Sequence, residues 1–367
     1  MEEGIFVSID LTLNILLRLP GSSVVSIRSV CKLWNSITRN PNFIKTHLIA
    51  HSSDPDPPSL IIFSQEDSHV GHRYHLTVLD GSMKQTFRLT RSSDPILATP
   101  PCNGLICLFD YRRNIQICNP TTRQIVSLPR PAADSSTIAN SFPKCFLGFH
   151  PQTEEYKVVR FFYREQRHLN RTYNLGCETF TLGKSHSWRY VGSITSYITG
   201  PGINVDGCVY WMSGVSSETI EKIIVLDLKS ETFRLISPPS IDDYLNDTKG
   251  IISLALLEGR LCLVNSPVSS SGAMDIWMMK NSLWIHKYHV PIAYHLQGHR
   301  SWPEPVLVHN GKMLVRWGNG LYKHVLKTTE KAEKVYSDRC LGNLAKVYGF
   351  VESLMPLKAS TMSFSWQ

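Results

Sequence analysis

Histidines at short, regular intervals are the residues of this sequence that come nearest to a chemical site. His69, His72 and His75 stand three residues apart, and His286 and His289 repeat that interval. Residues three apart on a strand point to opposite faces, and no cysteine lies at zinc-finger spacing from any of these histidines. We therefore predict no metal site and no bound cofactor.

The sequence motifs of the common enzyme classes are absent. The sequence contains no HExxH motif, no GxSxG nucleophile turn and no Walker A loop, since Gly311-Lys312 lacks the upstream glycine and the following Ser or Thr. An enzyme on a circular β scaffold would use carboxylates in its central channel, but the sequence singles out no pair of acids. We therefore predict no catalytic residues and no enzymatic activity.

The composition fits a globular protein with room for more than one domain. The chain has 367 residues, of which 42% are apolar. Its net charge of +8 comes from dispersed Lys and Arg without a basic block, so nucleic acid is not an expected partner. The start "MEEGIFVSID" is not a signal peptide, and no run approaches 18 uncharged apolar residues, so no membrane association is expected. Nine scattered cysteines form no CxxC pair, which favours a reducing compartment, and we expect the protein in the cytoplasm, the nucleus or both.

The elements that position any functional side chains begin with an apolar helical segment, residues 7–48. Asp10, Asn14 and Arg18 fall at helical spacing and form one narrow polar stripe, while nearly every other position up to Leu19 is apolar. Fifty residues are too few to surround such a helix. Some of its apolar surface must therefore contact the rest of the chain or a partner protein.

Three or four short helices are predicted in this segment. Pro20-Gly21 ends the first helix, and Ser22 or Ser23 is expected to cap the second. Apolar residues return at helical spacing over residues 24–37. Asn40-Pro41 then provides an N-cap and a first-turn proline for the last helix.

This segment resembles the F-box. The resemblance is carried by Ile15-Leu16, Arg18-Leu19-Pro20, Arg28-x-Val30-Cys31-Lys32-x-Trp34, Asn40-Pro41-x-Phe43 and His47-Leu48. The sequence departs from the usual pattern at Val7-Ser8, where Leu-Pro is common, and at Gly21-Ser22-Ser23, where the second helix often begins with Lys-Ser.

F-boxes bind an SKP-type adaptor, which links them to a cullin and a RING protein. The resemblance therefore implies that the surplus apolar surface is an adaptor interface, in which Leu19 and Trp34 are residues of the kind that dominate binding energy. The alternative is that Cys31 and Trp34 only fill the core of the small domain. The residues that the resemblance places at the adaptor are Ile9, Leu11, Ile15, Leu16, Leu19, Pro20, Val24, Ile27, Val30, Cys31 and Trp34.

A strand-rich domain follows a polar, proline-rich linker, "HSSDPDPPS", at residues 51–59. Short runs of β-branched and aromatic residues alternate there with turn residues. They form weakly repeated units about 40–60 residues apart, which is the size of a four-stranded propeller blade. Residues 346–354 are expected to supply the strand that closes the ring. The units begin near Leu60, Asn103, Cys145, Asn204, Ile252 and Pro305.

This half of the chain resembles the F-box-associated interaction domain of the large plant F-box families, which is similar in plan to kelch-type propellers. The glycines suit turn positions with positive φ, and the tryptophans are predicted to pack between blades. His150 stands where the family often has Asp. The resemblance is carried by Asn103-Gly104-Leu105, Asn119-Pro120-Thr121-Thr122-Arg123, Gly148-Phe149, Trp188, Tyr210-Trp211, Asp227 with Glu231 and Phe233, and Ile276-Trp277.

Pattern and resemblance together predict two domains of different class. A small all-α F-box module occupies residues 1–50 and precedes the linker at 51–59. A large all-β, propeller-like domain of about six irregular blades occupies residues 60–355, and a tail occupies 356–367.

The resemblance implies a non-catalytic substrate receptor of an SCF-type ubiquitin ligase. The helical module would dock on the adaptor, and loops of the β-domain would hold a target protein that the sequence does not identify. Candidate target-binding loops lie at residues 131–143, 164–174 and 239–249. Two alternatives stay open: a propeller-type enzyme or sugar-binding module whose helices only cap its core, and an adaptor-binding protein that acts outside ubiquitin transfer.

Overall fold

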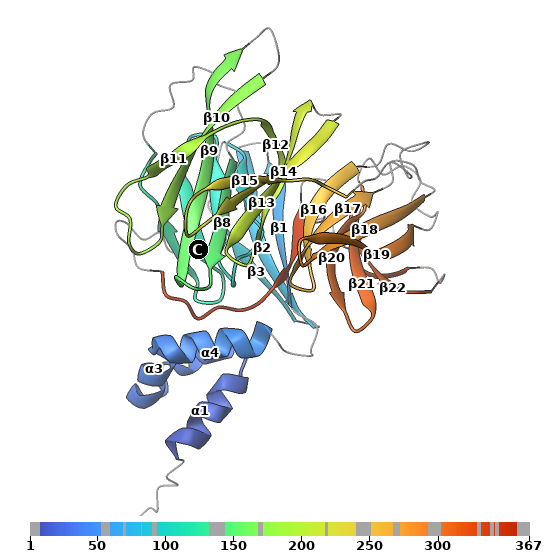
Figure 1. The fold of residues 1–367 in the computed structure, drawn as a ribbon. Coiled ribbons are helices and arrows are strands. Elements are labelled where there is room, and N and C mark those ends of the chain that lie inside the picture. The colour runs from blue at the N-terminus through green and yellow to red at the C-terminus, as the bar shows by residue number, and fades with distance from the viewer. Residues whose placement is uncertain are drawn as a thin grey trace, which may run out of the picture.

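The structure of the chain, a computed structural model, has an N-terminal region of four helices followed by a six-bladed β-propeller (Figure 1). The helices lie against one face of the propeller, and the last described residues, in dark red, run between the two parts. None of the described helices combines the length and apolar character needed to cross a membrane. The structure describes residues 8–52, 59–68, 71–81, 83–89, 94–131, 144–167, 172–216, 219–239, 251–266, 272–292, 302–328, 332–337, 341 and 345–357.

The four helices are short, and local caps fix three of their starts. Ser8 Oγ accepts a hydrogen bond from Leu11 N at 3.2 Å, and Asn40 Oδ1 accepts one from Asn42 N at 2.8 Å. The predicted helix start at Asn40-Pro41 is thereby confirmed. The helices are α1 (Ile9–Arg18), α2 (Gly21–Ile27), α3 (Lys32–Arg39) and α4 (Pro41–Ser52).

The second helix differs from its prediction at both ends. α2 begins at Gly21 and receives no side-chain cap from its N-cap residue Pro20, so the predicted capping by Ser22 or Ser23 is wrong. The apolar run over residues 24–37 is not one helix, because a turn at residues 28–30 interrupts it. α3 starts afresh with Cys31 as its N-cap, and Cys31 Sγ accepts a hydrogen bond from the backbone N–H of the third helical residue at 3.4 Å.

Six antiparallel four-stranded sheets form the blades of the propeller. Blade 1 contains β24 (Lys346–Phe350), β1 (Ser59–Ser68), β2 (Gly71–Asp80) and β3 (Met83–Arg88); blade 2 contains β4 (Ile96–Ala98), β5 (Ile106–Asp110), β6 (Ile115–Asn119) and β7 (Gln124–Ser127). Blade 3 contains β8 (Lys144–His150), β9 (Glu155–Arg167), β10 (Thr172–Thr181) and β11 (Arg189–Thr195); blade 4 contains β12 (Tyr197–Val205), β13 (Cys208–Ser216), β14 (Thr219–Asp227) and β15 (Phe233–Ile236). Blade 5 contains β16 (Ile251–Leu257), β17 (Arg260–Ser266), β18 (Gly272–Lys280) and β19 (Leu283–Ile292); blade 6 contains β20 (Glu304–His309), β21 (Lys312–Trp317), β22 (Gly320–Val325) and β23 (Glu333–Ser337).

The ring closes through a strand from the end of the chain. β24 pairs antiparallel with β1, with Phe350 opposite Ser59 and Lys346 opposite Phe63. First strands of neighbouring blades contact one another from β8 through β12, β16 and β20 to β24, so β24 is the innermost strand of blade 1. The predicted closing strand is confirmed, although it ends at Phe350 rather than continuing to residue 354.

Most of the predicted blade starts agree with the strands. β1, β8, β16 and β20 each begin within one residue of a predicted start. Blades 2 and 4 begin seven residues earlier than predicted, at Ile96 and Tyr197. The prediction placed these starts at Asn103 and Asn204, which lie after β4 and near the end of β12. It therefore left out the innermost strand of each of these two blades.

Apolar side chains fill the spaces between neighbouring blades. Trp211 is fully buried between blades 3 and 4, where its ring centroid lies 4.9 Å from that of Phe146 and 5.1 Å from that of Phe161. Trp277 is buried among residues of blades 4 and 5. The prediction that tryptophans pack between blades is confirmed for these two.

Candidate binding surface of the helical module

The helical module, residues 8–52, has a small core. Leu16 of α1, Val24 of α2, and Phe43 and Ile44 of α4 are buried together. Leu354, from the far end of the chain, is the fifth buried member of this cluster. The module therefore completes its core with a residue that its own sequence does not supply.

Large apolar side chains remain exposed on the module after this core is filled. On α1, Ile9, Leu11 and Ile15 are 59%, 53% and 48% exposed, and Leu11 and Ile15 stand four residues apart on one helical face. Val30, in the turn before α3, and Leu33, in the first turn of α3, are 63% and 49% exposed. Large apolar side chains left exposed on a small module are candidates for contact with a partner. We therefore take these five residues as the candidate binding surface.

The eleven residues predicted at an adaptor interface fall into three groups. Leu19, Ile27 and Trp34 are partly buried and pack against the module core, so Trp34 does contribute to that core. Leu16 and Val24 have no exposed surface, and their assignment to an interface is corrected, because a partner cannot reach them while the module is folded. The exposed group is Ile9, Leu11, Ile15, Pro20, Val30 and Cys31.

Two exposed apolar residues were missed by the sequence analysis. Helical spacing across residues 24–37 groups Leu33 with the inward-facing Trp34 and Ile37, but the turn at residues 28–30 gives α3 a new orientation. Ile49 of α4 is 56% exposed, although its neighbours in sequence are apolar. Cys31 is a weak helix former and can act as an N-cap. A helix break predicted at Cys31 is the sequence signal that would have identified Leu33 as an exposed residue.

Two histidines of α4 hold the end of α1. His47 Nε2 lies 2.9 Å from the carbonyl oxygen of Leu19, and His51 Nε2 lies 3.2 Å from that of Leu17. A carbonyl can only accept, so both rings donate an N–H to the last carbonyls of the helix region. Burial lowers the pKa of His47, which favours its neutral form. His47 therefore ties α4 to α1 as a neutral ring.

The stability of the module is expected to fall as the pH drops below about 6.5, the ordinary pKa of histidine. Because burial lowers the folded-state pKa of His47, the unfolded state binds the proton first, so stability is full above that value and is lost on acidification. Hydrogen exchange of the amides of α1 and α4, followed from pH 7.5 to about 5, measures this loss. A His47→Gln variant should remove most of the pH dependence; an unchanged dependence would contradict the role of His47.

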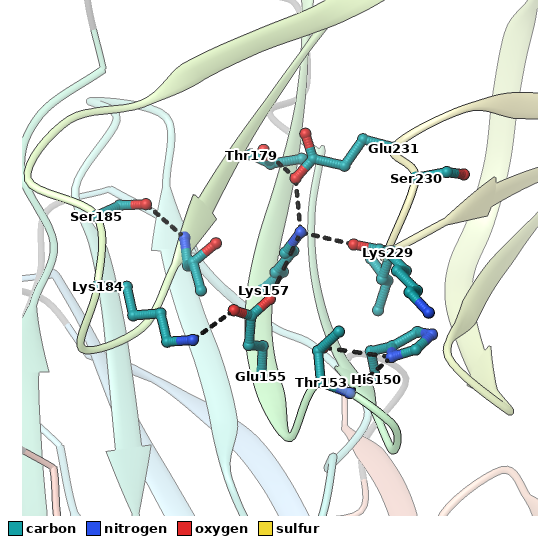
Figure 2. A network of polar contacts seen from close by, with 12 residues as sticks. His150, Thr153, Glu155, Lys157, Thr179, Lys184, Ser185, Lys229, Ser230 and Glu231 are labelled. Atoms are coloured by element: carbon teal, nitrogen blue, oxygen red, sulfur yellow. Dashed lines mark hydrogen bonds and ion pairs between the residues drawn. The ribbon is translucent and has the colours of Figure 1, made fainter.

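A network of charged side chains is buried between blades 3 and 4 (Figure 2). Glu231, in the turn between β14 and β15, accepts hydrogen bonds from Lys157 Nζ at 2.7 Å and Thr179 Oγ1 at 3.2 Å, and its other oxygen pairs with Arg189. Lys157 Nζ also donates to Leu228 O at 2.6 Å, and burial lowers the pKa of Lys157. Because each oxygen of Glu231 already contacts a cation, the network joins two blades and does not present a free acid or base.

The two histidines of β19 share a carboxylate. Asp275 Oδ1 lies 2.9 Å from His286 Nε2 and 2.8 Å from His289 Nδ1. A bulge at Lys287 adds one residue to β19, so residues three apart return to the same face. The prediction that these histidines point to opposite faces is therefore wrong.

Metal ligation is the chemistry for which the closely spaced histidines of the sequence were considered. Within the part of the chain that the structure describes, no group of three or more His, Cys, Asp or Glu side chains is arranged to hold a metal ion. Of the first histidine set, His69 lies outside the described residues.

The strands that flank the three predicted target-binding loops end at the face of the ring away from the helical module. The module meets the turns that contain Thr121 and Glu154. Because successive strands are antiparallel, the connections β7–β8, β9–β10 and β15–β16 leave from the opposite face. Most of these loops lie outside the described residues, at 132–143, 168–171 and 240–250, and the rest of 164–174 belongs to β9 and β10.

Comparison with known proteins finds both parts of this architecture in one family. A model of the F-box domain matches residues 8–46, and a model of the F-box associated beta propeller domain matches residues 48–301. The F-box/kelch-repeat protein At1g12870 of Arabidopsis thaliana is 26% identical over 294 residues, which cover 74% of this chain and 68% of that protein. The Arabidopsis thaliana F-box protein At3g10240 is 29% identical over 301 residues, covering 77% and 70%. A third Arabidopsis thaliana F-box protein, At5g52610, is 30% identical over 281 residues, covering 75% and 74%.

Proposed function

Because the chain belongs to the F-box proteins that carry an F-box-associated β-propeller domain, we propose that it is the substrate-recognition subunit of an SCF-type ubiquitin ligase. In this proposal the helical module binds an SKP-family adaptor, which connects it to a cullin and a RING protein. The propeller holds a target protein. The chain performs no bond chemistry itself and works in the cytoplasm, the nucleus or both.

Proximity is the mechanism that such a receptor needs. Holding the target on the ligase raises the effective concentration of its lysines around the ubiquitin-carrying enzyme, without any catalytic group on the receptor. The strands that flank the predicted target-binding loops end at the ring face away from the module, so a target held there would not compete with an adaptor bound to the module. This arrangement supports simultaneous binding of adaptor and target.

The observation that carries the proposal is the apolar surface that the module keeps exposed. Ile9, Leu11 and Ile15 on α1, with Val30 and Leu33, remain exposed although the module has a buried core that Leu354 completes. F-box domains in general bind an SKP adaptor, and residues 8–46 match an F-box domain. In our proposal these five exposed residues contact the adaptor. No target is identified by these residues.

Replacing Leu11 and Ile15 by aspartate in the full chain is expected to weaken binding to a purified SKP adaptor by about 30-fold or more. Both side chains are half exposed, so the fold should tolerate the change, whereas the new carboxylates would have to lose their water at the interface. Isothermal titration calorimetry with the intact chain measures the affinity, and circular dichroism confirms that the variant is folded.

The matched control is Leu283→Asp on β19 of the propeller. Leu283 is 69% exposed and lies outside the module, so this substitution makes the same chemical change at a distance. Its adaptor affinity should equal that of the unmodified chain. Wild-type affinity in the double variant, or no adaptor binding by the unmodified chain, would overturn the proposal.

A further inference from the structure

We infer that the C-terminal segment of residues 351–357, here called the strap, is a working part of the adaptor-binding module, with Glu352 and Leu354 as its positioning residues. The inference rests on the proposed function, because the strap sets the shape of the surface offered to the adaptor. The two residues lie more than 300 positions from the helices that they support.

Leu354 acts through the core of the module. It is 1% exposed and is buried with Leu16, Val24, Phe43 and Ile44, which come from three of the four helices. Leu16 follows Ile15 on α1, so the side chain that Leu354 packs against adjoins one that is offered to the adaptor. Without Leu354, the core has a cavity that the short helices can fill only by shifting.

Glu352 acts through the start of α2. That helix has no side-chain cap from its N-cap residue, Pro20. Instead, Glu352 Oε2 accepts a hydrogen bond from Ser22 N at 3.0 Å and lies 3.5 Å from Ser22 Oγ. A carboxylate at this place satisfies a free helical N–H and is favoured by the helix dipole. The distant glutamate therefore replaces the local cap that the sequence lacks.

Gly21 explains why the strap can come so close. A Cβ atom at this position would lie 2.9 Å from Glu352 Cβ and 3.0 Å from Thr121 Cγ2, which is closer than side chains normally pack. Gly21 is also the first residue of the stretch where the sequence departs from the usual F-box pattern. The departure therefore makes room for the strap and for the propeller turn behind it.

The propeller holds the other side of the strap. Asn119 Nδ2, which is buried, donates to the carbonyl oxygens of Ser353 and Met355, each at 2.9 Å. Thr121 Oγ1 accepts a hydrogen bond from Ser353 N at 3.2 Å. Gly104 has a φ of +77°, and a Cβ there would lie 2.5 Å from the carbonyl oxygen of Val351. The strap is therefore clamped between the module and blade 2, and it joins them by packed contacts.

The consequence is that the module takes its binding form only when the strap is seated. If only a fraction of the molecules has the module in its binding form, the apparent affinity for the adaptor equals the intrinsic affinity multiplied by that fraction. The same contacts fix the direction in which the propeller projects from the module. The end of the chain therefore influences both the strength of adaptor binding and the position of a bound target.

The test measures adaptor affinity and hydrogen exchange for the full chain and four variants. Leu354→Ala should weaken adaptor binding by about tenfold or more and speed amide exchange in α1 and α2, since it opens a cavity in the module core. Leu354→Met, which keeps the volume, should restore affinity to within about threefold. Glu352→Ala should weaken binding more than Glu352→Gln, whose amide oxygen still accepts from Ser22 N.

A matched core variant separates the strap from general destabilisation. Leu261 is also buried, but it packs between blades 4 and 5, so Leu261→Ala should destabilise the protein and leave adaptor affinity within about twofold of the unmodified chain. Wild-type affinity and exchange in Leu354→Ala, or equal losses of affinity in Leu354→Ala and Leu261→Ala, would overturn the inference while the proposed function stands. If the unmodified chain does not bind the adaptor, the proposed function fails and the inference with it.

Discussion

Glu231→Ala is expected to lower the free energy of unfolding by about 3–5 kcal/mol, because it leaves a buried cation without its partner. Lys157 is 5% exposed, and its ammonium would keep Leu228 O at 2.6 Å and the more distant carboxylate of Glu155 at 3.9 Å. Arg189 would lose its partner as well, but its side chain is 66% exposed and can turn to water. The loss therefore comes mainly from Lys157, and chemical denaturation followed by circular dichroism measures it.

Two controls identify the mechanism of this loss. Lys184→Ala removes an exposed lysine that pairs with Glu155 at 2.7 Å in the same network, and it should cost under about 1 kcal/mol because surface pairs are weak. The double variant Lys157→Met/Glu231→Leu should recover much of the stability lost in Glu231→Ala, since apolar residues of similar size often replace a buried pair without penalty. A loss below about 1 kcal/mol in Glu231→Ala would show that the network does not hold the blades together.

Trp211→Ala is expected to destabilise the protein by about 3–5 kcal/mol, the usual cost of emptying a large aromatic site. Trp211 is fully buried, and both Phe146 and Phe161 of blade 3 meet its ring edge to face. The backbone at Gly202 packs directly against the indole, because a Cβ atom at that position would overlap it. This close packing limits how far the structure can collapse into the cavity left by Trp211→Ala. The measurement is again the free energy of unfolding.

Trp188 provides the comparison for Trp211. It is only partly buried, and its Nε1 donates to Pro129 O at 2.7 Å. Trp188→Ala should therefore cost clearly less than Trp211→Ala, although the same atoms are removed. Equal costs would mean that the two inter-blade spaces are packed equally well, contrary to the structure.

Features with a local cause could be predicted from the sequence. The Asn40-Pro41 helix start depends on one side chain and one ring, and both lie within the segment that they shape. The blades repeat at a regular interval, so four starts and the closing strand were located closely. The same holds for Trp211, whose size and apolar ring suit a space between sheets.

Features with a distant cause could not be predicted. α2 begins at Gly21 because Glu352 supplies the missing cap, and no window of local sequence contains both residues. The resemblance places Leu16 at an interface, yet the structure buries it in a core that Leu354 helps to form. The pairing of His286 and His289 with one carboxylate depends on a single-residue bulge, which strand periodicity does not reveal.

The pairing of β24 with β1 also determines when the ring can form during synthesis. Ser59 and Phe350 are about 290 residues apart in the chain, and bringing together the ends of so long a loop costs roughly 5 kcal/mol of chain entropy in addition to a constant term. Blades 2 to 6 are each made from one continuous stretch and can fold as they leave the ribosome. The inner edge of β1, in contrast, has no partner until β24, the last strand of the propeller, has been made, and an unpaired edge attracts other strands. Completion of the first blade therefore follows the synthesis of the other five blades.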